Sequence, residues 1–314
     1  MKMKKIIFRT KLILPAILFS ISLNGYSQEM PTGGDVQSGD VTISGYGTNE
    51  LRIDQKSQKS IIHWDSFSIN PQGRVDFNQP SSSSFSLNRV NGSTPSSIAG
   101  KLNSNGKVML INPNGIAITP GAVINTNSFT ASSLDIKNEN FLKDKYIFEG
   151  KGSSKGVVNK GSINVNGGGH AALLGGLVSN TGIVNAKLGK IFLGSGEKIT
   201  VDFVGDGLMK VTIPISKLGN IKDIKGRTLK SIVSNKGTLK ANGGIVQLSA
   251  ADAQYLSRGT VNLSQSGKIY ARNVGNKSGR IVIGGPNNQS INLAGTLDAS
   301  SRYQMQAQNK NSVV

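Results

Sequence analysis

The sequence of 314 residues contains no cysteine, only two histidines and a single tryptophan. Without cysteine the chain has neither a disulfide scaffold nor a cysteine-ligated zinc site. The two histidines, His63 and His170, lie far apart in the sequence, so their spacing does not predict a metal site. We expect each of them to be a surface residue or a packing residue.

Acidic residues are scarce as well, with 17 Asp and Glu against 36 Lys and Arg. Enzymes that cleave polysaccharides need clustered carboxylates, for general acid–base catalysis or to bind calcium. Asp202 and Asp206 flank Gly205 as in a calcium loop, but further carboxylates are missing and we favour a hairpin turn. The sequence therefore favours a protein that is not an enzyme and that needs no cofactor or metal.

Aromatic residues make up only 5% of the chain, while glycine is abundant, with 39 residues. So few large side chains cannot fill a thick globular core. Small and β-branched residues suit thin stacked layers of strands instead.

A short apolar segment near the N-terminus reads as a secretory signal peptide. Residues 12–23 are too short to span a bilayer comfortably, and five basic residues precede them. Small residues at 25 and 27 place the cleavage near Ser27, before Gln28; an uncleaved anchor is the alternative. We therefore divide the chain into a signal peptide (1–27), a folded domain (28–300) and a disordered tail (301–314).

Removing the five basic residues of the signal peptide lowers the formal net charge from +19 to +14. A charge of this size favours anionic partners such as outer-membrane lipid or acidic glycans. Nucleic acid is not favoured, because the lysines are spread along the chain and are not interleaved with aromatic residues.

A repeat of about twenty residues appears in the second half of the chain. The segment 158–165 recurs at 178–186 and 233–241, and in shorter form at 259–263; Gly161 to Gly182 is 21 residues and Gly237 to Gly259 is 22. Asn-x-Gly turns between β-branched strands with such a period are typical of stacked rungs. The predicted fold is all-β: a right-handed parallel β-helix from about residue 35 to residue 300.

The centre of the chain is a strand, a tight turn and a second strand. Asn112-Pro113-Asn114-Gly115 follows the apolar run 107–111 and precedes another at 116–118. Pro113 sets the backbone for the second position of a turn, Asn114 tolerates the third, and Gly115 releases the chain without steric cost.

This turn belongs to an ordered series of motifs: 62–67, 75–80, Leu87-Asn88-Arg89-Val90, 98–102, 106–115 and 131–136. The series resembles the N-terminal secretion domain of filamentous haemagglutinin-type exoproteins, over about residues 33–300. These are the secreted partners in two-partner secretion systems of Gram-negative bacteria. The resemblance implies an N-terminal cap at 32–69 and two excursions from the β-helix, at 138–155 and 200–230, the second a hairpin. We expect Trp64, the single tryptophan, to be buried beside Phe67 as a core residue, because tryptophan usually packs in cores; stacking on a ligand is the alternative.

The resemblance also implies a function. Such a domain is recognised in the periplasm by its transporter, an Omp85-type outer-membrane barrel with POTRA domains, and folds outside the cell. The implied site for recognition or fold nucleation is Asn112, Pro113, Asn114 and Gly115, together with Leu87, Asn88, Arg89 and Val90; we favour nucleation. We expect a secreted or surface-bound monomer. The alternative is a complete small adhesin that binds glycans or cell surfaces.

Overall fold

The structure is a computed structural model that describes residues 30–151, 154–203, 207–213, 232–250, 261–284 and 291–301. The predicted signal peptide and all but the first residue of the predicted tail lie outside these residues. So do Gly205 and Asp206 of the predicted hairpin turn.

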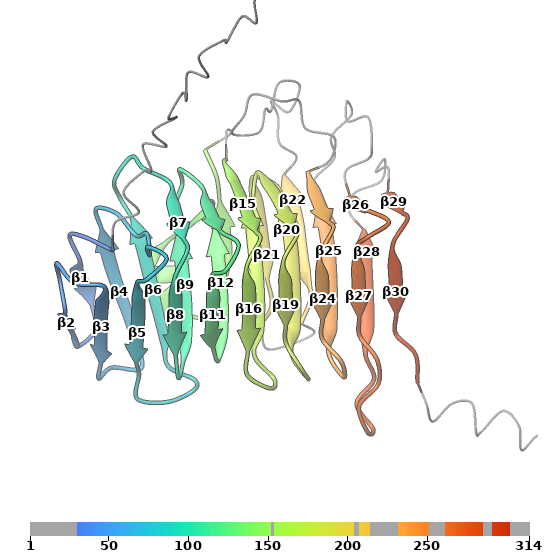
Figure 1. Ribbon diagram of the computed structural model, residues 1–314, viewed down its shortest axis with the longest axis horizontal. Coiled ribbons are helices and arrows are strands. Elements are labelled where there is room, and N and C mark those ends of the chain that lie inside the picture. Colours follow the sequence, from blue (N-terminus) through green and yellow to red (C-terminus); the bar gives the residue numbers. More distant parts are fainter. Residues whose placement is uncertain are drawn as a thin grey trace, which may run out of the picture.

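Within the described residues, the strands form three long sheets and one small outer sheet, and the long sheets follow the same axis (Figure 1). Sheet 1 contains β1 (Asp35–Ser38), β4 (Lys59–Trp64), β6 (Phe85–Val90), β9 (Lys107–Ile111), β12 (Ser128–Ser132), β17 (His170–Gly175), β20 (Lys190–Ser195), β25 (Ile245–Ala250) and β28 (Arg280–Gly284). Sheet 2 contains β7 (Ser96–Ile98), β10 (Ile116–Ile118), β15 (Gly156–Asn159), β18 (Leu177–Asn180), β23 (Val233–Asn235), β26 (Val261–Leu263) and β29 (Ile291–Leu293). Sheet 3 contains β2 (Val41–Ser44), β3 (Glu50–Gln55), β5 (Arg74–Asn78), β8 (Lys101–Ser104), β11 (Val123–Thr126), β16 (Ser162–Val165), β19 (Ile183–Asn185), β24 (Thr238–Lys240), β27 (Lys268–Tyr270) and β30 (Thr296–Asp298). The outer sheet contains β13 (Asp135–Ile136), β14 (Ile147–Glu149), β21 (Lys198–Val201) and β22 (Met209–Ile213).

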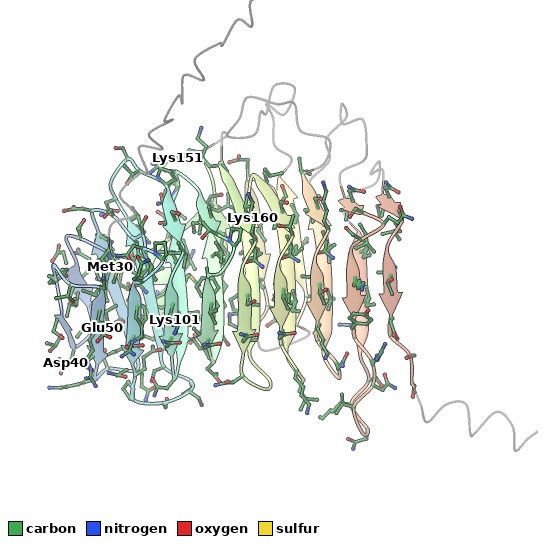
Figure 2. The ribbon with its side chains drawn as sticks, in the orientation of Figure 1. Met30, Asp40, Glu50, Lys101, Lys151 and Lys160 are labelled. Atoms are coloured by element: carbon green, nitrogen blue, oxygen red, sulfur yellow. The ribbon has the colours of Figure 1, made fainter. Side chains whose placement is uncertain are left out.

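The chain visits the three long sheets in turn, one strand in each, and then begins the next rung. Strands β6, β7 and β8 make one rung, and each pairs in parallel with its counterpart among β9, β10 and β11. This path is a parallel β-helix, as the repeat predicted. The basic side chains of Lys101, Lys151 and Lys160 are exposed on the outside of the coil (Figure 2).

The N-terminal end is closed by two antiparallel strands, as predicted for this region. Strand β1 pairs antiparallel with β4 in sheet 1, and β2 pairs antiparallel with β3 in sheet 3. They cover edges that would otherwise present unpaired backbone groups. Just below the cap, Trp64 is buried and its ring meets that of Phe67 edge-on, with centroids 5.2 Å apart, which confirms that Trp64 is a core residue.

Both predicted excursions add strands to the outer sheet, which is antiparallel throughout. The first contains β14 and a short helix, α1 (Asn138–Leu142). The second begins with the hairpin of β21 and β22, and its residues 214–230 lie outside the described residues. In the described part of the chain, no helix is long and apolar enough to cross a membrane. The four antiparallel strands of the outer sheet form a second layer on the outside of the β-helix, which has its own buried interior.

The predicted copies of the repeat at 178–186 and 233–241 are confirmed, and the predicted alignment of the copy at 259–263 is wrong. Gly161, Gly182 and Gly237 stack at the same corner, and a Cβ on Gly182 would overlap the carbonyl oxygen of Gly161. The short copy at 259–263 is misaligned, because Val261–Leu263 pairs with Val233–Asn235 in sheet 2 and the rung counterpart of Gly237 is Gly267. Leu263 replaces the corner asparagine there, so the sequence signal of that corner is lost.

A column of asparagines, the buried ladder, links successive corners of sheet 2. It consists of Asn159, Asn180 and Asn235, all fully buried. The Nδ2 of Asn159 donates to Oδ1 of Asn180 (2.8 Å), and the Nδ2 of Asn180 donates to Oδ1 of Asn235 (2.7 Å). A buried amide needs such partners, because leaving it unpaired is costly.

We predict that Asn180→Ala lowers the free energy of unfolding by about 2–4 kcal/mol, because it leaves a buried donor on Asn159 and a buried acceptor on Asn235 unpaired. The matched control is Asn125→Ala, which removes an exposed asparagine of sheet 3 and should cost less than about 1 kcal/mol. Urea denaturation of both variants tests this. Equal losses would show that the buried ladder does not contribute more than a surface contact.

Candidate functional site

The two predicted motifs lie on neighbouring strands. Leu87, Asn88, Arg89 and Val90 form the second half of β6, and the turn 112–115 follows β9 directly. The strands pair in parallel with Leu87 opposite Met109 and Arg89 opposite Ile111. The structure thus brings together two motifs that are separated by more than twenty residues in the sequence.

The turn at 112–115 has the backbone that its residue types predict. The N–H of Gly115 donates to the carbonyl oxygen of Asn112 (2.9 Å), and the N–H of Asn114 donates to Oδ1 of Asn112 (2.9 Å). Gly115 has a φ of 105°, which a residue with a side chain rarely adopts. Pro113 is exposed at the tip.

Both asparagine side chains of this turn reach back to the preceding rung. The Nδ2 of Asn112 donates to the carbonyl oxygen of Thr94 (2.9 Å) and to Oγ of Ser96 (3.0 Å). The Nδ2 of Asn114 donates to the carbonyl oxygen of Gly92 (2.8 Å). Asn112 is fully buried, so its amide has no access to water. These hydrogen bonds therefore connect the corner formed by residues 112–115 to the loop that follows β6.

Alternate residues of β6 face opposite sides of sheet 1, and both sides are buried. Asn88 points inward, where its Oδ1 accepts a hydrogen bond from Nε1 of Trp64 (3.0 Å). Val90 also packs in the interior, whereas Leu87 belongs to a second cluster outside the coil. The sequence did not show this division, because a strand covered on both faces lacks the usual apolar–polar alternation.

Arg89 faces outward and holds the first excursion. Its Nε bonds Oδ1 of Asp135 (2.8 Å), Nη1 bonds Oδ1 of Asn138 (2.8 Å), and Nη2 bonds the carbonyl oxygen of Ile136 (2.6 Å). Nη1 also lies 2.8 Å from Nε2 of His63, and burial together with the Arg89 charge lowers the pKa of that histidine. Every nitrogen of the guanidinium has a partner, so Arg89 is the anchor of the outer layer.

The outer layer encloses an apolar cluster against the outside of sheet 1, which we name the outer cluster; it includes Leu87, Met109, Phe141, Phe148 and Ile199. His170 is buried beside it, and its ring stacks on that of Phe203 with centroids 3.7 Å apart. Burial, and then the charges of Lys107 and Lys190, lower the pKa of His170 to about 3. His170 is thus a neutral packing residue, whereas His63 is half-buried against Arg89.

The comparisons with known proteins agree with this architecture. The family described as TPS secretion domain matches residues 27–305. The chain belongs to this family. TPS exoproteins are secreted across the outer membrane, and a TPS secretion domain implies a cognate transporter there; the family is not a known enzyme family.

Among its relatives are two heme/hemopexin-binding proteins of Haemophilus influenzae, one of them from strain Rd. The Rd protein is 32% identical over 264 residues, which is 82% of this chain and 27% of the relative. The other is 28% identical over 283 residues, covering 82% of this chain and 29% of the relative. This chain therefore spans under a third of the curated relatives that it matches.

Among solved structures, the HMW1 secretion domain from Haemophilus influenzae is similar, with 35% identity and a TM-score of 0.68. The match covers 81% of this chain and 62% of that one. At this level of identity, the agreement supports the family as well as the fold.

We predict that Arg89→Lys lowers the free energy of unfolding by about 2–3 kcal/mol, because an ammonium cannot reproduce the fork of the guanidinium. The matched control is Arg52→Lys, in an exposed ion pair with Asp54, which should change stability by less than about 0.5 kcal/mol. Hydrogen exchange should rise selectively at 135–149. Unchanged exchange there would mean that Arg89 does not anchor the outer layer.

His170 makes stability depend on pH. In the unfolded chain its pKa is about 6.5, whereas in the fold it is about 3, so between these values the unfolded state binds a proton that the native state does not. The neutral imidazole of His170 makes its full contribution to the free energy of unfolding above pH 6.5. This contribution is lost as the pH falls toward 3. We expect His170→Gln to reduce the difference in unfolding free energy between pH 7 and pH 5 by about 2 kcal/mol. An unchanged difference in urea denaturation would contradict this.

Proposed function

We propose that residues 28–300 are a secretion-targeting domain that is not an enzyme, exported to the periplasm by a signal peptide cleaved near Ser27. Its partner is an Omp85-type transporter with POTRA domains in the outer membrane. The domain crosses unfolded and folds outside, where it starts the β-helix. Membership of the TPS secretion domain family supports this proposal, since such a domain implies a transporter.

The choice of the turn at 112–115 as the functional site is supported by the hydrogen bonds that Asn112 and Asn114 donate to the loop of the preceding rung. These bonds form only when two rungs come together. A residue that closes the second rung on the first is suited to nucleation, because the first stacked pair carries the full entropy cost of ordering the chain. Later rungs then add to a finished edge.

The backbone chemistry is compatible with recognition in the unfolded state. Strand-forming segments such as 107–111 and 116–118 can add to an exposed sheet edge of the transporter by β-augmentation. Once outside, the same backbone groups pair with neighbouring rungs. The free energy of folding then favours outward movement without a nucleotide site.

The proposal that the domain is not an enzyme is supported by its family, which is not a known enzyme family. In the residues that the structure describes, no three histidine or acidic side chains come close enough to hold a metal ion. Several acids are engaged in ion pairs near the surface, such as those of Asp54 and Asp76. Such carboxylates neutralise arginines and are poorly placed for acid–base chemistry.

We predict that Asn112→Ala and Asn114→Ala each reduce secretion and slow refolding of the purified domain together. Asn112→Ala should be the more severe, with a loss of about 2–3 kcal/mol, because its amide is fully buried. The measurement is co-expression with the cognate transporter, with the secreted fraction assayed in the medium, alongside refolding after dilution from urea. Asn125→Ala, which removes an exposed asparagine within strand β11, is the control.

Measuring secretion and refolding together distinguishes the two roles of the motif, recognition by the transporter and fold nucleation. If secretion collapses while refolding rate and stability stay at the wild-type values, the turn is a recognition signal and nucleation is wrong. Normal secretion by both variants would remove the turn from the mechanism. Failure of the wild-type chain to appear in the medium with its transporter would contradict the proposed function itself.

A further inference from the structure

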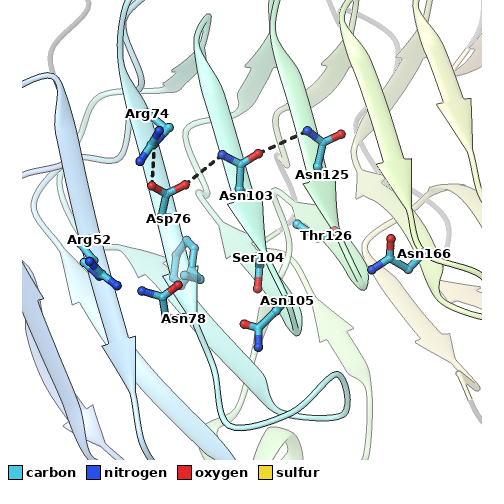
Figure 3. Close-up of a pocket in the computed structure, with 11 residues that line it drawn as sticks. Arg52, Arg74, Asp76, Asn78, Asn103, Ser104, Asn105, Asn125, Thr126 and Asn166 are labelled. Carbon is cyan, nitrogen blue, oxygen red and sulfur yellow. Dashed lines mark hydrogen bonds and ion pairs between the residues drawn. The ribbon is translucent and has the colours of Figure 1, made fainter.

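The outside of sheet 3 carries a groove that secretion does not explain. Its volume is about 490 Å³, within the range of small-ligand sites. Strands β3, β5, β8 and β11 contribute to its lining, and apart from Phe77 the lining residues have polar or charged side chains (Figure 3). Amides, guanidiniums and hydroxyls gather there on four successive rungs.

A row of side chains, the exposed ladder, runs through this groove and beyond it: Asp76, Asn103, Asn125, Asn164 and Asn185, each in register with the next. Each amide nitrogen donates to the preceding member, over 2.9, 3.3, 3.1 and 2.9 Å in turn. Figure 3 shows the links from Asp76 to Asn103 and from Asn103 to Asn125. The ladder holds the side chains in one orientation.

The exposed ladder leaves half of its hydrogen-bonding capacity for a ligand. An asparagine has two N–H donors and two acceptor lone pairs, and the ladder uses one of each at Asn103 and Asn125. Each of these rungs therefore presents one donor and one acceptor, about 4.8 Å from those of the next. A hydroxyl group, which donates and accepts at once, matches such a pair.

Two guanidiniums extend the groove, and their charges are already balanced. Arg52 and Arg74 each use Nε to bind the acid two residues further on, Asp54 at 3.1 Å and Asp76 at 2.6 Å. Within the described residues, their terminal nitrogens have no partner and can donate. A paired guanidinium offers hydrogen bonds without a strong field, so the groove suits an uncharged ligand better than a polyanion.

Thr126 lies beside the groove, but its side chain alternates with that of Asn125 along β11 and faces the interior of the coil. Thr126 is only 2% exposed, yet its Oγ1 has no hydrogen-bond partner in the part of the chain that the structure describes. Buried hydroxyls nearly always have a partner, because leaving one unpaired is unfavourable. A ligand in the groove cannot reach this hydroxyl, because the atom is buried from solvent. The groups that face a ligand are therefore those of the exposed ladder and of the two guanidiniums.

We infer that this groove binds a hydroxyl-rich, uncharged oligosaccharide laid along the exposed ladder. Nucleic acid does not fit, because Phe77, the aromatic residue of the groove, is 1% exposed and gives no surface for base stacking. An extended peptide would need the edge of a sheet for backbone pairing, and the groove lies on a face. The inference concerns the folded domain and does not rest on the proposed secretion function.

The test is an NMR titration of the folded, ¹⁵N-labelled domain with cellohexaose, maltohexaose and chitohexaose, and with a heparin hexasaccharide as the charged comparison. At least one neutral hexasaccharide should shift the side-chain amide signals of Asn103 and Asn125, with a Kd on the order of 0.1–1 mM. Such an affinity is expected because exposed hydrogen bonds contribute little individually.

Two variants test the position of the site. Asn125→Ala should weaken binding about fivefold, the effect of one hydrogen bond. Asn103→Ala should weaken it by a similar factor, because it removes the neighbouring amide of the exposed ladder. Asn292→Ala is the control, because Asn292 is an exposed asparagine that bonds Asn262 in sheet 2, away from the groove.

Three results would overturn the inference. The first is that no neutral hexasaccharide shifts the amides of the exposed ladder. The second is binding that Asn125→Ala and Asn103→Ala leave unchanged. The third is binding of the heparin hexasaccharide alone, which would indicate charge attraction to the lysines instead of recognition by the groove. Because the titration uses folded protein, a failure of secretion would not affect its outcome.

Discussion

The structure depends on contact between successive rungs. No rung buries its own interior face, and its backbone groups pair only with the rungs on either side. Side-chain amides follow the same rule, since the buried ladder and the turn at 112–115 make their hydrogen bonds between rungs. Stability is therefore gained by addition to an existing edge. The antiparallel cap of β1 and β2 closes one end of this series and gives the chain a defined first rung.

The two predicted motifs lie where two layers meet. Inside the coil, Asn88 on β6 fixes Trp64, while outside it Arg89 on the same strand fixes the first excursion. The next strand, β9, leads into the turn whose asparagines bind the loop after β6. A disturbance at β6 or β9 would reach both the interior and the outer cluster. We therefore expect substitutions in this short polar turn to affect the packing of both layers.

Local chemistry made much of this fold predictable. The period of the corner glycines and the burial of Trp64 follow from residue types and short spacings, whereas the cap and the second hairpin are implied by the resemblance to the secretion domain. The partners of Arg89 could not be predicted in this way, because Asp135 and Asn138 come from a segment that leaves the β-helix. The predicted alignment of the copy at 259–263 is wrong for a related reason. Apolar Leu263 lies at the corner where earlier rungs have asparagine, so the similar sequence does not occupy the same place in the rung.

Asparagines occur in three settings in this chain: the turn at 112–115, the buried ladder and the exposed ladder. These settings differ in how far water reaches the side-chain amides. In the turn at 112–115 and in the buried ladder, the amides lack water, so each hydrogen bond between rungs is needed to avoid an unpaired group. In the exposed ladder water can replace any lost partner, so stacking there adds little to stability. An ordered row of half-used amides on a face that does not require them for folding is then available for recognition. The same rung spacing that builds the fold also sets the spacing of its donors and acceptors, and a ligand with a matching repeat can use several rungs at once.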